Sequence, residues 1–355
     1  MKYIEMLQQS LPDGMDGVII FSEHNRRYFT GFDSSAGLLL VTRDAACFLT
    51  DFRYIEAAKT QAAGCEVRLL EDQPKQLPML FDEFKVKTCG FETRDLPFAD
   101  YINLKKDLPG VEFNQTTIAD DIIERLRMVK SDEEIALIKK SQEITDAAFR
   151  HVIEMIKPGV AERDIALEIE FFMKKNGASG PSFDLIVVSG EKSSLPHGVP
   201  GERKFQNGDF ITMDIGALYH GYCSDMTRTV ALGSLSDEQK KVYNLVLKAQ
   251  LEAEKAVRPG IACNEVDRIA RDMIYSAGYT GCFGHGLGHS TGLQIHEQPR
   301  FSPTCRTILR KGMIMSVEPG IYLAGRFGVR IEDLVLVSDT GCEILTQSPK
   351  ELMIL

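Results

Sequence analysis

The sequence predicts an α/β protein with two domains, of which the second consists of two related halves. Three observations support this prediction. The chain has 355 residues, more than a typical single domain. Short apolar runs alternate with helical stretches up to about residue 122. From Lys157 onwards, one pattern of helix, histidine and acidic strand occurs twice, about a hundred residues apart.

Composition and charge exclude several classes of protein. Hydrophobic residues make up 44% of the chain and charged residues 26%, as in an ordinary globular protein. The net charge of −10 disfavours nucleic acid as a partner, because nucleic-acid binding requires a basic surface. The first residues, MKYIEMLQQSLPDG, lack the apolar core of a signal peptide, and no run approaches the roughly 18 apolar residues of a membrane span. The eight cysteines form no CxxC pair, so we expect reduced thiols in a cytoplasmic protein without membrane association.

The first domain is predicted from short apolar strands and one amphipathic helix. In order, we expect strands at residues 17–21, 37–41, 46–49, 66–70 and 87–91, and a helix at residues 51–62. Several polar side chains here can either line a cleft or subunit contact, or serve as caps and surface salt bridges. They are Asn25, Arg27, Tyr28, Asp51 and Arg53.

A long helix is predicted to start the second domain. Ser131 and Glu134 have the spacing of a capping box, in which each side chain bonds the backbone N–H of the other residue. The preceding segment IIERLRMVK is the predicted connection, so we place the domains at residues 1–125 and 126–355. The apolar face of the helix is predicted from Leu137, Ile144, Ala148, Val152 and Met155, and the helix ends at Pro158-Gly159.

Two segments of the second domain match in register. KPGV at residues 157–160 is echoed by RPGI at residues 258–261, and a helix that ends near a glycine follows each. A histidine comes about twenty residues after that glycine in both copies, at His197 and at His296. We therefore predict a duplicated α/β unit with internal pseudo-symmetry.

Four carboxylates occupy matching places in the two copies. NGDFITMDIG at residues 207–216 parallels KGMIMSVEPG at residues 311–320, and each strand places apolar residues on one face and an acid on the other. With one more acid on each following strand, the four are Asp214, Asp225, Glu318 and Glu332. Pairing with Arg228 and Arg330 is one way to bury such acids. Four crowded negative charges favour cations between them, and hard divalent metal ions are the natural solution.

The segment GCFGHGLGHSTGLQIHEQP, residues 281–299, holds three histidines and five glycines. It cannot be an ordinary helix, because each interior glycine costs about 1 kcal/mol relative to alanine. His289 is the predicted imidazole ligand of a dinuclear centre, in which two ions about 3.5–4 Å apart share a hydroxide and polarise a carbonyl. His197 and His296 would donate hydrogen bonds to a developing oxyanion. Metal-assisted hydrolysis is the expected reaction class.

These motifs resemble the creatinase/aminopeptidase P/prolidase group of metallopeptidases. The matching stretches are MDIGALYHGYCSDMTRT (213–229), FGHGLGHSTGLQIHEQPR (283–300), SVEPGIY (316–322), GVRIED (328–333), YFTGF (28–32), TDFRY (50–54) and LRMVKSDEE (126–134). The resemblance thus covers both domains. It implies a small creatinase-type α/β domain followed by a pseudo-symmetric catalytic domain with the pita-bread fold.

The resemblance implies a role for each metal ligand. Asp214 would bind one ion, and Asp225 and Glu332 would bridge both ions. His289 and Glu318 would hold the second ion, and Glu318 would help to take the proton from the bridging water. Members of the group generally use manganese, cobalt or zinc and are usually dimers. We therefore expect two divalent ions, with manganese ahead of cobalt and zinc, and a homodimer.

The resemblance also implies how substrate is held. His197 and His296 would bind the scissile carbonyl and stabilise the tetrahedral intermediate. Arg300 would contact the C-terminal carboxylate of the substrate, and Arg330 would steady the site. His285 is expected to support the glycine loop rather than to bind metal.

The implied substrates are short peptides with proline at the second position, cleaved before the proline by a dipeptidase or by an aminopeptidase. Methionine aminopeptidase shares the catalytic fold, but the extra domain and GVRIED argue against it. Creatinase-like hydrolysis without metal and a non-catalytic binding role would both be marked by missing ligands, and all five ligand positions are filled. One departure from the group is Ser290-Thr291, where a glycine followed by an aliphatic residue is more usual.

Overall fold

The computed structural model describes residues 2–355, which divide into a unit up to Arg127 and a unit from Met128 to Leu355. The first unit is built on one six-stranded sheet with the order β4-β3-β2-β1-β5-β6. The β1–β2 and β2–β3 pairs are antiparallel, whereas the β3–β4, β1–β5 and β5–β6 pairs are parallel. The strands are β1 (Gly17–Ile20), β2 (Leu38–Thr42), β3 (Ala46–Thr50), β4 (Glu66–Leu69), β5 (Thr88–Phe91) and β6 (Glu112–Asn114).

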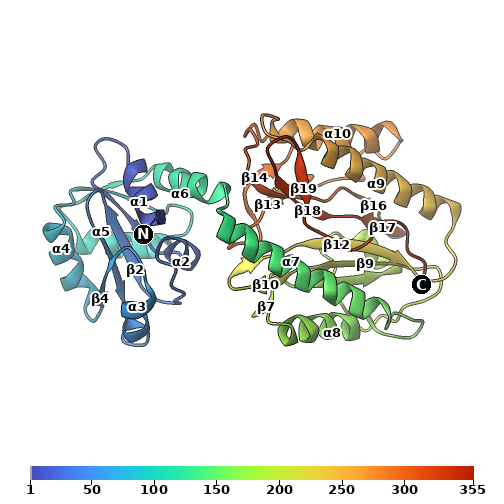
Figure 1. Cartoon of the computed structure of the whole chain (residues 1–355), viewed down its shortest axis with the longest axis horizontal. Helices are drawn as coiled ribbons and strands as arrows, with labels where there is room; N and C mark the ends of the chain where they lie inside the picture. The colour runs from blue at the N-terminus through green and yellow to red at the C-terminus, as the bar shows by residue number, and fades with distance from the viewer. Residues whose placement is uncertain (1) are drawn as a thin grey trace. The chain divides into compact units, whose positions relative to one another are not determined.

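The helices α1 to α6 accompany this sheet (Figure 1). They are α1 (Lys2–Ser10), α2 (Glu23–Thr30), α3 (Ile55–Gln61), α4 (Gln73–Glu83), α5 (Phe98–Asp107) and α6 (Ile118–Met128). The helix expected from residue 51 begins at Ile55, because residues 52–54 form a turn in which Asp51 accepts a hydrogen bond from the Arg53 backbone. Arg27 and Arg53 form ion pairs with Asp33 and Asp51, as surface salt bridges would.

The second unit places helices on both sides of curved antiparallel sheets (Figure 1). One three-stranded sheet has the order β12-β9-β8, and a five-stranded sheet has the order β14-β13-β15-β18-β19. Two smaller sheets, β11-β10-β7 and β16-β17, complete the unit. The predicted fold class, a small α/β domain followed by a pseudo-symmetric pita-bread domain, is confirmed.

The elements of the second unit follow the duplicated pattern. The helices are α7 (Asp132–Ile153), α8 (Glu162–Lys175), α9 (Asp237–Ala256) and α10 (Cys263–Ser276), with a 3₁₀ turn η1 (Gly190–Ser194). The strands of the first half are β7 (Gly180–Pro181), β8 (Ile186–Ser189), β9 (Phe210–Ile215), β10 (Ala217–Tyr219), β11 (Tyr222–Cys223) and β12 (Met226–Ala231). Those of the second half are β13 (Gly288–Ser290), β14 (Glu297–Phe301), β15 (Ile314–Val317), β16 (Gly320–Leu323), β17 (Phe327–Arg330), β18 (Asp333–Val337) and β19 (Cys342–Ile344).

Two hydrophobic cores fix the strands that carry the acids. Ile211, Met213 and Ile215 of β9 pack against α7 and α8 in one core, as the alternation of side chains predicts. Met315 and Val317 of β15 pack into a second core with α9 and α10. The polar side chains near the ends of both strands, Asp214 and Ser316 among them, lie on the opposite faces, together with the apolar Phe210 and Ile314.

The long helix α7 begins as the sequence predicts. Ser131 accepts from the Glu134 backbone, and the Glu134 side chain accepts from the Ser131 backbone, which completes the capping box. Met155, expected on the buried face, is instead 38% exposed, because the helix ends at Ile153 before Met155 is reached.

Candidate metal centre

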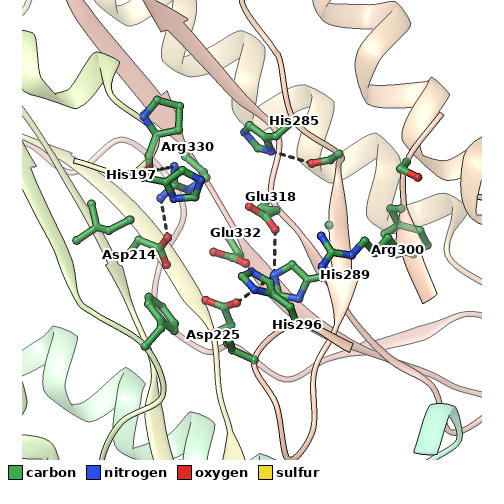
Figure 2. Close-up of a pocket in the computed structure, with 18 of the residues that line it drawn as sticks. His197, Asp214, Asp225, His285, His289, His296, Arg300, Glu318, Arg330 and Glu332 are labelled. Atoms are coloured by element: carbon green, nitrogen blue, oxygen red, sulfur yellow. Dashed lines mark hydrogen bonds and ion pairs between the residues drawn. The ribbon is translucent and has the colours of Figure 1, made fainter. Parts of the chain in front are cut away.

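The first two acids come from β9 and from the segment that leads into β12. Asp214 lies near the end of β9 and pairs in register with Thr227 of β12. Asp225 comes one residue before β12, not within it as the sequence predicts, and its side chain is buried. Both carboxylates face the same cavity, which places the first half's acids side by side (Figure 2).

The other two acids come from the matching strands of the second half. Glu318 directly follows β15, and its N–H donates to the carbonyl of Leu287. Glu332 precedes β18, and its N–H donates to the carbonyl of Thr227 on β12 at 3.1 Å. The Thr227 hydroxyl also donates to the Glu332 carboxylate at 2.7 Å. This pair of contacts ties the second half's acid directly to the first half's strand.

His289 enters the cavity from β13, at the end of the glycine-rich loop. A Cβ at Gly288 would collide with the carbonyl of Ser316 on β15, so glycine allows the two strands to approach. The Nδ1 atom of His289 lies 3.1 Å from the carbonyl of Ser290, which can only accept, so Nδ1 carries the proton. The unprotonated Nε2 then points toward the acids, 3.3 Å from Glu318 and 3.5 Å from Asp225.

The residues present fit a metal centre. Ligand atoms of Asp225, His289 and Glu332 all lie within 4.8 Å of one another, and all three side chains are buried. Among the buried side-chain atoms of residues 2–355, Asp214 Oδ1 and Glu332 Oε1 have no hydrogen-bond partner. Buried carboxylate oxygens without partners are costly, and together with an imidazole they form a donor set suited to divalent cations.

The pKa shifts of the cluster also favour a bound cation. Burial, followed by repulsion from the neighbouring carboxylates, raises the pKa of Asp225 and of Glu332 well above their usual range. Burial raises the pKa of Glu318 to about 8 and lowers the pKa of His289 to about 3. The side chains alone therefore cannot keep all these acids ionised, and positive charge is required among them.

The residues expected to contact substrate lie at the exposed part of the same cavity, which has a volume of about 480 Å³. His197, His296 and Arg300 line it and are exposed, whereas Asp225 and Glu332 are buried. The rings of His289 and His296 are 4.5 Å apart, centre to centre. Figure 2 shows the imidazoles and the carboxylates converging from both halves.

Arg330 is buried at the end of β17 and pairs with Asp214 at 2.6 Å. Its guanidinium also donates to the hydroxyls of Thr227 and Tyr322, at 3.0 and 2.9 Å. His285 lies 3.0 Å from the same Tyr322 hydroxyl and is not part of the three-residue ligand cluster. Arg330 thus holds Asp214 against the cavity wall.

Several cavity residues did not emerge from the sequence. Thr227 and Tyr322 lie inside motifs that the sequence highlights, but their hydroxyl contacts depend on partners about 100 and 8 residues away. Five apolar side chains that were not predicted as site residues also line the cavity: Phe183, Ile186, Pro196, Ile295 and Phe301.

Among residues 2–355, none of the helices has the length and apolar character that a membrane-spanning helix needs.

Family models match both units of the chain. The model of metallopeptidase family M24 matches residues 136–339, and the model of the creatinase/prolidase N-terminal domain matches residues 4–129. A relative named Xaa-Pro dipeptidase, from Pyrococcus horikoshii, is 38% identical over 354 residues and covers 99% of this chain and 97% of its own length. An uncharacterized peptidase of Bacillus subtilis is 43% identical over 96% of both chains.

Solved structures of similar proteins superpose closely. An Xaa-Pro dipeptidase from Bacillus anthracis has a TM-score of 0.97 at 43% identity, covering 100% of this chain and 99% of that chain. An X-Pro aminopeptidase from Thermotoga maritima has a TM-score of 0.89 at 36% identity, covering 96% and 98%. The fold is thus shared with peptidases of both descriptions.

Proposed function

The chain belongs to metallopeptidase family M24 and is a peptidase, and we propose that it hydrolyses the bond between an N-terminal residue and proline with two divalent metal ions. The observation that carries the proposal is the convergence of four acids and one imidazole, from both halves of the second unit, on one cavity. The relatives named Xaa-Pro dipeptidase support the choice of substrate.

We assign the ligands as follows. Asp214 would hold one ion, Asp225 and Glu332 would be shared by both ions, and His289 and Glu318 would hold the other. Manganese is the first choice, with cobalt or zinc as alternatives. When bound, the two ions would activate the attacking water and polarise the carbonyl of the scissile bond.

The protein's own side chains handle the proton and the substrate. Glu318, which faces the same cavity, would accept the proton of the attacking water. His197 and His296 donate hydrogen bonds to the carbonyl oxygen as negative charge develops there. Arg330 keeps Asp214 in place through its ion pair at 2.6 Å.

Arg300 selects the length of the substrate. It lies at the exposed part of the cavity, where a guanidinium can bind the free carboxylate of a dipeptide. The apolar side chains of Phe183, Ile186 and Ile295 provide surface for the proline ring and for the first side chain. A dipeptide with proline second, carrying its free carboxylate, therefore suits the cavity best.

The organisation of the whole protein follows from the resemblance. We assign residues 1–125 to a creatinase-like domain and residues 126–355 to the catalytic domain. A homodimer in the cytoplasm is the form we expect to be active, because dimers are usual in the group and the scattered cysteines suit a reducing compartment.

Hydrolysis of Ala-Pro and of Ala-Pro-Ala, after treatment with a chelator and then with added Mn²⁺, tests the proposal. Metal-dependent cleavage of Ala-Pro alone is the expected result, and Arg300→Gln should then raise KM for Ala-Pro. Preference for Ala-Pro-Ala would instead favour an aminopeptidase, the description carried by the Thermotoga maritima structure. Failure to cleave either peptide in the metal-bound state would overturn the proposed activity.

A further inference from the structure

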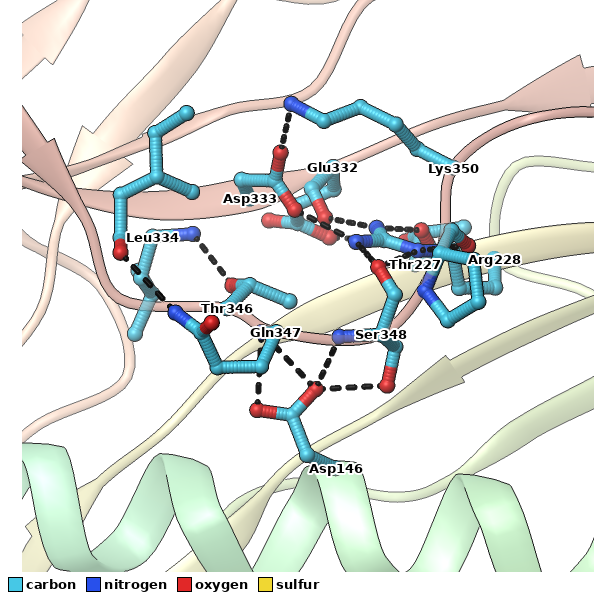
Figure 3. A network of polar contacts seen from close by, with 12 residues as sticks. Asp146, Thr227, Arg228, Glu332, Asp333, Leu334, Thr346, Gln347, Ser348 and Lys350 are labelled. Atoms are coloured by element: carbon cyan, nitrogen blue, oxygen red, sulfur yellow. Dashed lines mark hydrogen bonds and ion pairs between the residues drawn. The ribbon is translucent and has the colours of Figure 1, made fainter.

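In a short segment near the C-terminus, residues 346–350, two backbone N–H groups and a hydroxyl are bonded by a carboxylate of α7. We call this segment the strap. The backbone N–H groups of Gln347 and Ser348 donate to Asp146 at 3.1 and 2.7 Å, and the Ser348 hydroxyl donates to Asp146 at 2.5 Å. Asp146 is 2% exposed, so these bonds form away from solvent (Figure 3). The strap's position therefore depends on Asp146.

One guanidinium joins the strap to the segment that carries Glu332. Arg228 on β12 donates to the strap carbonyls of Ser348 and Pro349, at 2.7 and 3.0 Å. It also donates to the backbone carbonyl of Glu332 at 2.5 Å and to the Asp333 carboxylate at 2.6 Å. Arg228 is 1% exposed and lies between the strap and Glu332 in Figure 3.

Glu332 needs such support because it lies outside a strand ladder. It lies between β17 and β18, and in the described part of the chain its carboxylate accepts a hydrogen bond from the hydroxyl of Thr227. Thr227 fixes one carboxylate oxygen, and Arg228 fixes the backbone from the opposite side. The direction of the second carboxylate oxygen, which faces the ligand cluster, is set by these two neighbouring residues of β12 together.

We propose that the strap is a positioning element for Glu332, which acts through Arg228 and so tunes how tightly the centre binds metal. The inference rests on the proposed function, because it takes Glu332 to be a metal ligand. It adds a part of the chain, Asp146 and residues 346–350, that touches neither the metal ligands' side chains nor the cavity.

The charges of the network explain why the effect reaches the centre. Arg228 and Lys350 both pair with the buried Asp333, so neither cation can be displaced without leaving a buried charge incompletely matched. A planar guanidinium also holds its acceptors in fixed relative directions. If the strap shifts, Arg228 loses the two strap carbonyls that orient its guanidinium, and its hydrogen bond to the Glu332 backbone weakens. Partners outside the first shell of ligands typically change metal affinity by about 10–100-fold when mutated.

The test compares Asp146→Asn with a matched control, Asp120→Asn. Asp120 is also a buried helical aspartate, and it accepts from the Thr93 backbone, the Thr93 hydroxyl and the Arg94 backbone. Its partners do not line the cavity. Both variants therefore lose the charge of an acid that binds two N–H groups and one hydroxyl. Protein treated with a chelator is titrated with Mn²⁺, free Mn²⁺ is measured by EPR, and the metal-free Tm is recorded for each variant.

Asp146→Asn should weaken Mn²⁺ binding by about tenfold, whereas Asp120→Asn should leave it unchanged while lowering the metal-free Tm comparably. Equal Mn²⁺ affinity in wild type and Asp146→Asn, or an equal loss in both variants, would overturn the inference. If Asp146→Asn does not fold, Ser348→Ala removes a single donor and should still weaken binding, and wild-type affinity there overturns the inference. If Asp225→Asn bound Mn²⁺ as tightly as the wild type does, the proposed metal site itself would be overturned.

Discussion

The two halves of the second unit make equivalent backbone contacts, but different side chains support the segments that lead to their histidines. Each half has an isolated antiparallel bridge just before its helix, Ala161 with Lys204 before α8 and Ala262 with Ile308 before α10. In the first half, the buried carboxylate of Glu162, at the start of α8, accepts from the backbone of Ser189. In the second half, α10 starts instead with a buried cysteine, Cys263.

The second half uses a different charged pair for the same purpose. Asp267 accepts from the Leu287 backbone at 3.0 Å and pairs with Arg271, which donates to the His285 carbonyl at 2.7 Å. Glu162 is paired with Lys192, on the loop that leads to His197. The acids at the cavity kept equivalent positions, while the supports of the loops diverged. Duplication thus supplies a symmetric set of carboxylates, whereas His289 on β13 and Arg300 on β14 come from the second half alone.

The largest effect is expected when one of the two proposed bridging acids, one from each half, is neutralised. Asp225→Asn and Glu332→Gln should both abolish hydrolysis, with a loss greater than the roughly 10²–10³-fold cost of removing one oxyanion donor. Each removes a negative charge that the two ions share, so bound Mn²⁺ should fall as well. Activity on Ala-Pro, Mn²⁺ content and circular dichroism are measured together, and the fold should be retained.

Unequal outcomes would break the comparison. An active, metal-replete Asp225→Asn protein would contradict the two-metal proposal. If only Glu332→Gln were inactive, the matched positions would not have matched roles, and the centre would belong to the second half alone.

The histidines contributed by the two halves form the next comparison. His197→Ala and His296→Ala should each lower kcat for Ala-Pro by about 10²–10³-fold, because each removes a donor to the developing oxyanion. Glutamine at either position should restore part of the rate, since its amide N–H can donate in place of the ring. Mn²⁺ affinity serves as the control. If a variant bound Mn²⁺ more weakly but kept its kcat, that histidine would be a metal ligand instead of a donor to the oxyanion.

Metal removal should make stability depend on pH through acids from both halves. Without metal, burial raises the pKa of Glu318 to about 8 and that of Asp225 well above its usual range. A group with a raised folded-state pKa stabilises the protein below its unfolded value, 4.5 for Glu318, and that contribution is lost as pH rises through about 8. The Tm of the chelated protein should therefore fall by several degrees between about pH 5 and about pH 8. Saturating Mn²⁺ should largely remove this fall, and a pH-independent Tm without metal would contradict the crowding of these acids.

The sequence predicted the features that depend on local patterns. The alternation in β9 and β15 correctly assigned the buried faces, and the spacing of Ser131 and Glu134 correctly predicted the start of α7. The convergence of four acids on one cavity followed from the repeat, because equivalent strands of a duplicated unit deliver equivalent positions to one place.

Features set by distant partners could not be predicted. Arg228 was considered as a partner for a cavity acid, yet it pairs with Asp333 and with strap carbonyls about 120 residues away. Lys130 belonged to a predicted connecting segment, yet its side chain is 1% exposed. Neither the hydrophobic periodicity nor the spacing of motifs predicts which way a long side chain points. That direction is set by partners that come together only when the sheets are assembled.

The smallest expected effect concerns the hairpin that joins His289 to His296. Lys130 donates to the Ser290 hydroxyl at 2.9 Å and to the Glu297 carboxylate at 3.2 Å. Ser290→Gly, the residue more usual in the group, removes one of these contacts and leaves the ion pair with Glu297. It should lower the free energy of unfolding by about 1 kcal/mol, measured by urea denaturation.

Activity on Ala-Pro should stay within about twofold, because the ion pair still holds the end of the hairpin. Thr291→Val is the control, since the hydroxyl of the adjacent Thr291 donates to the Gln294 carbonyl at 3.4 Å, whereas the contacts of Lys130 are with Ser290 and Glu297. A large loss of Mn²⁺ affinity in Ser290→Gly alone would show that Lys130 sets the position of His289. The position of His289 in the second half would then depend on Lys130 of the connecting segment. The asymmetry between the halves would therefore include a residue outside the duplicated unit.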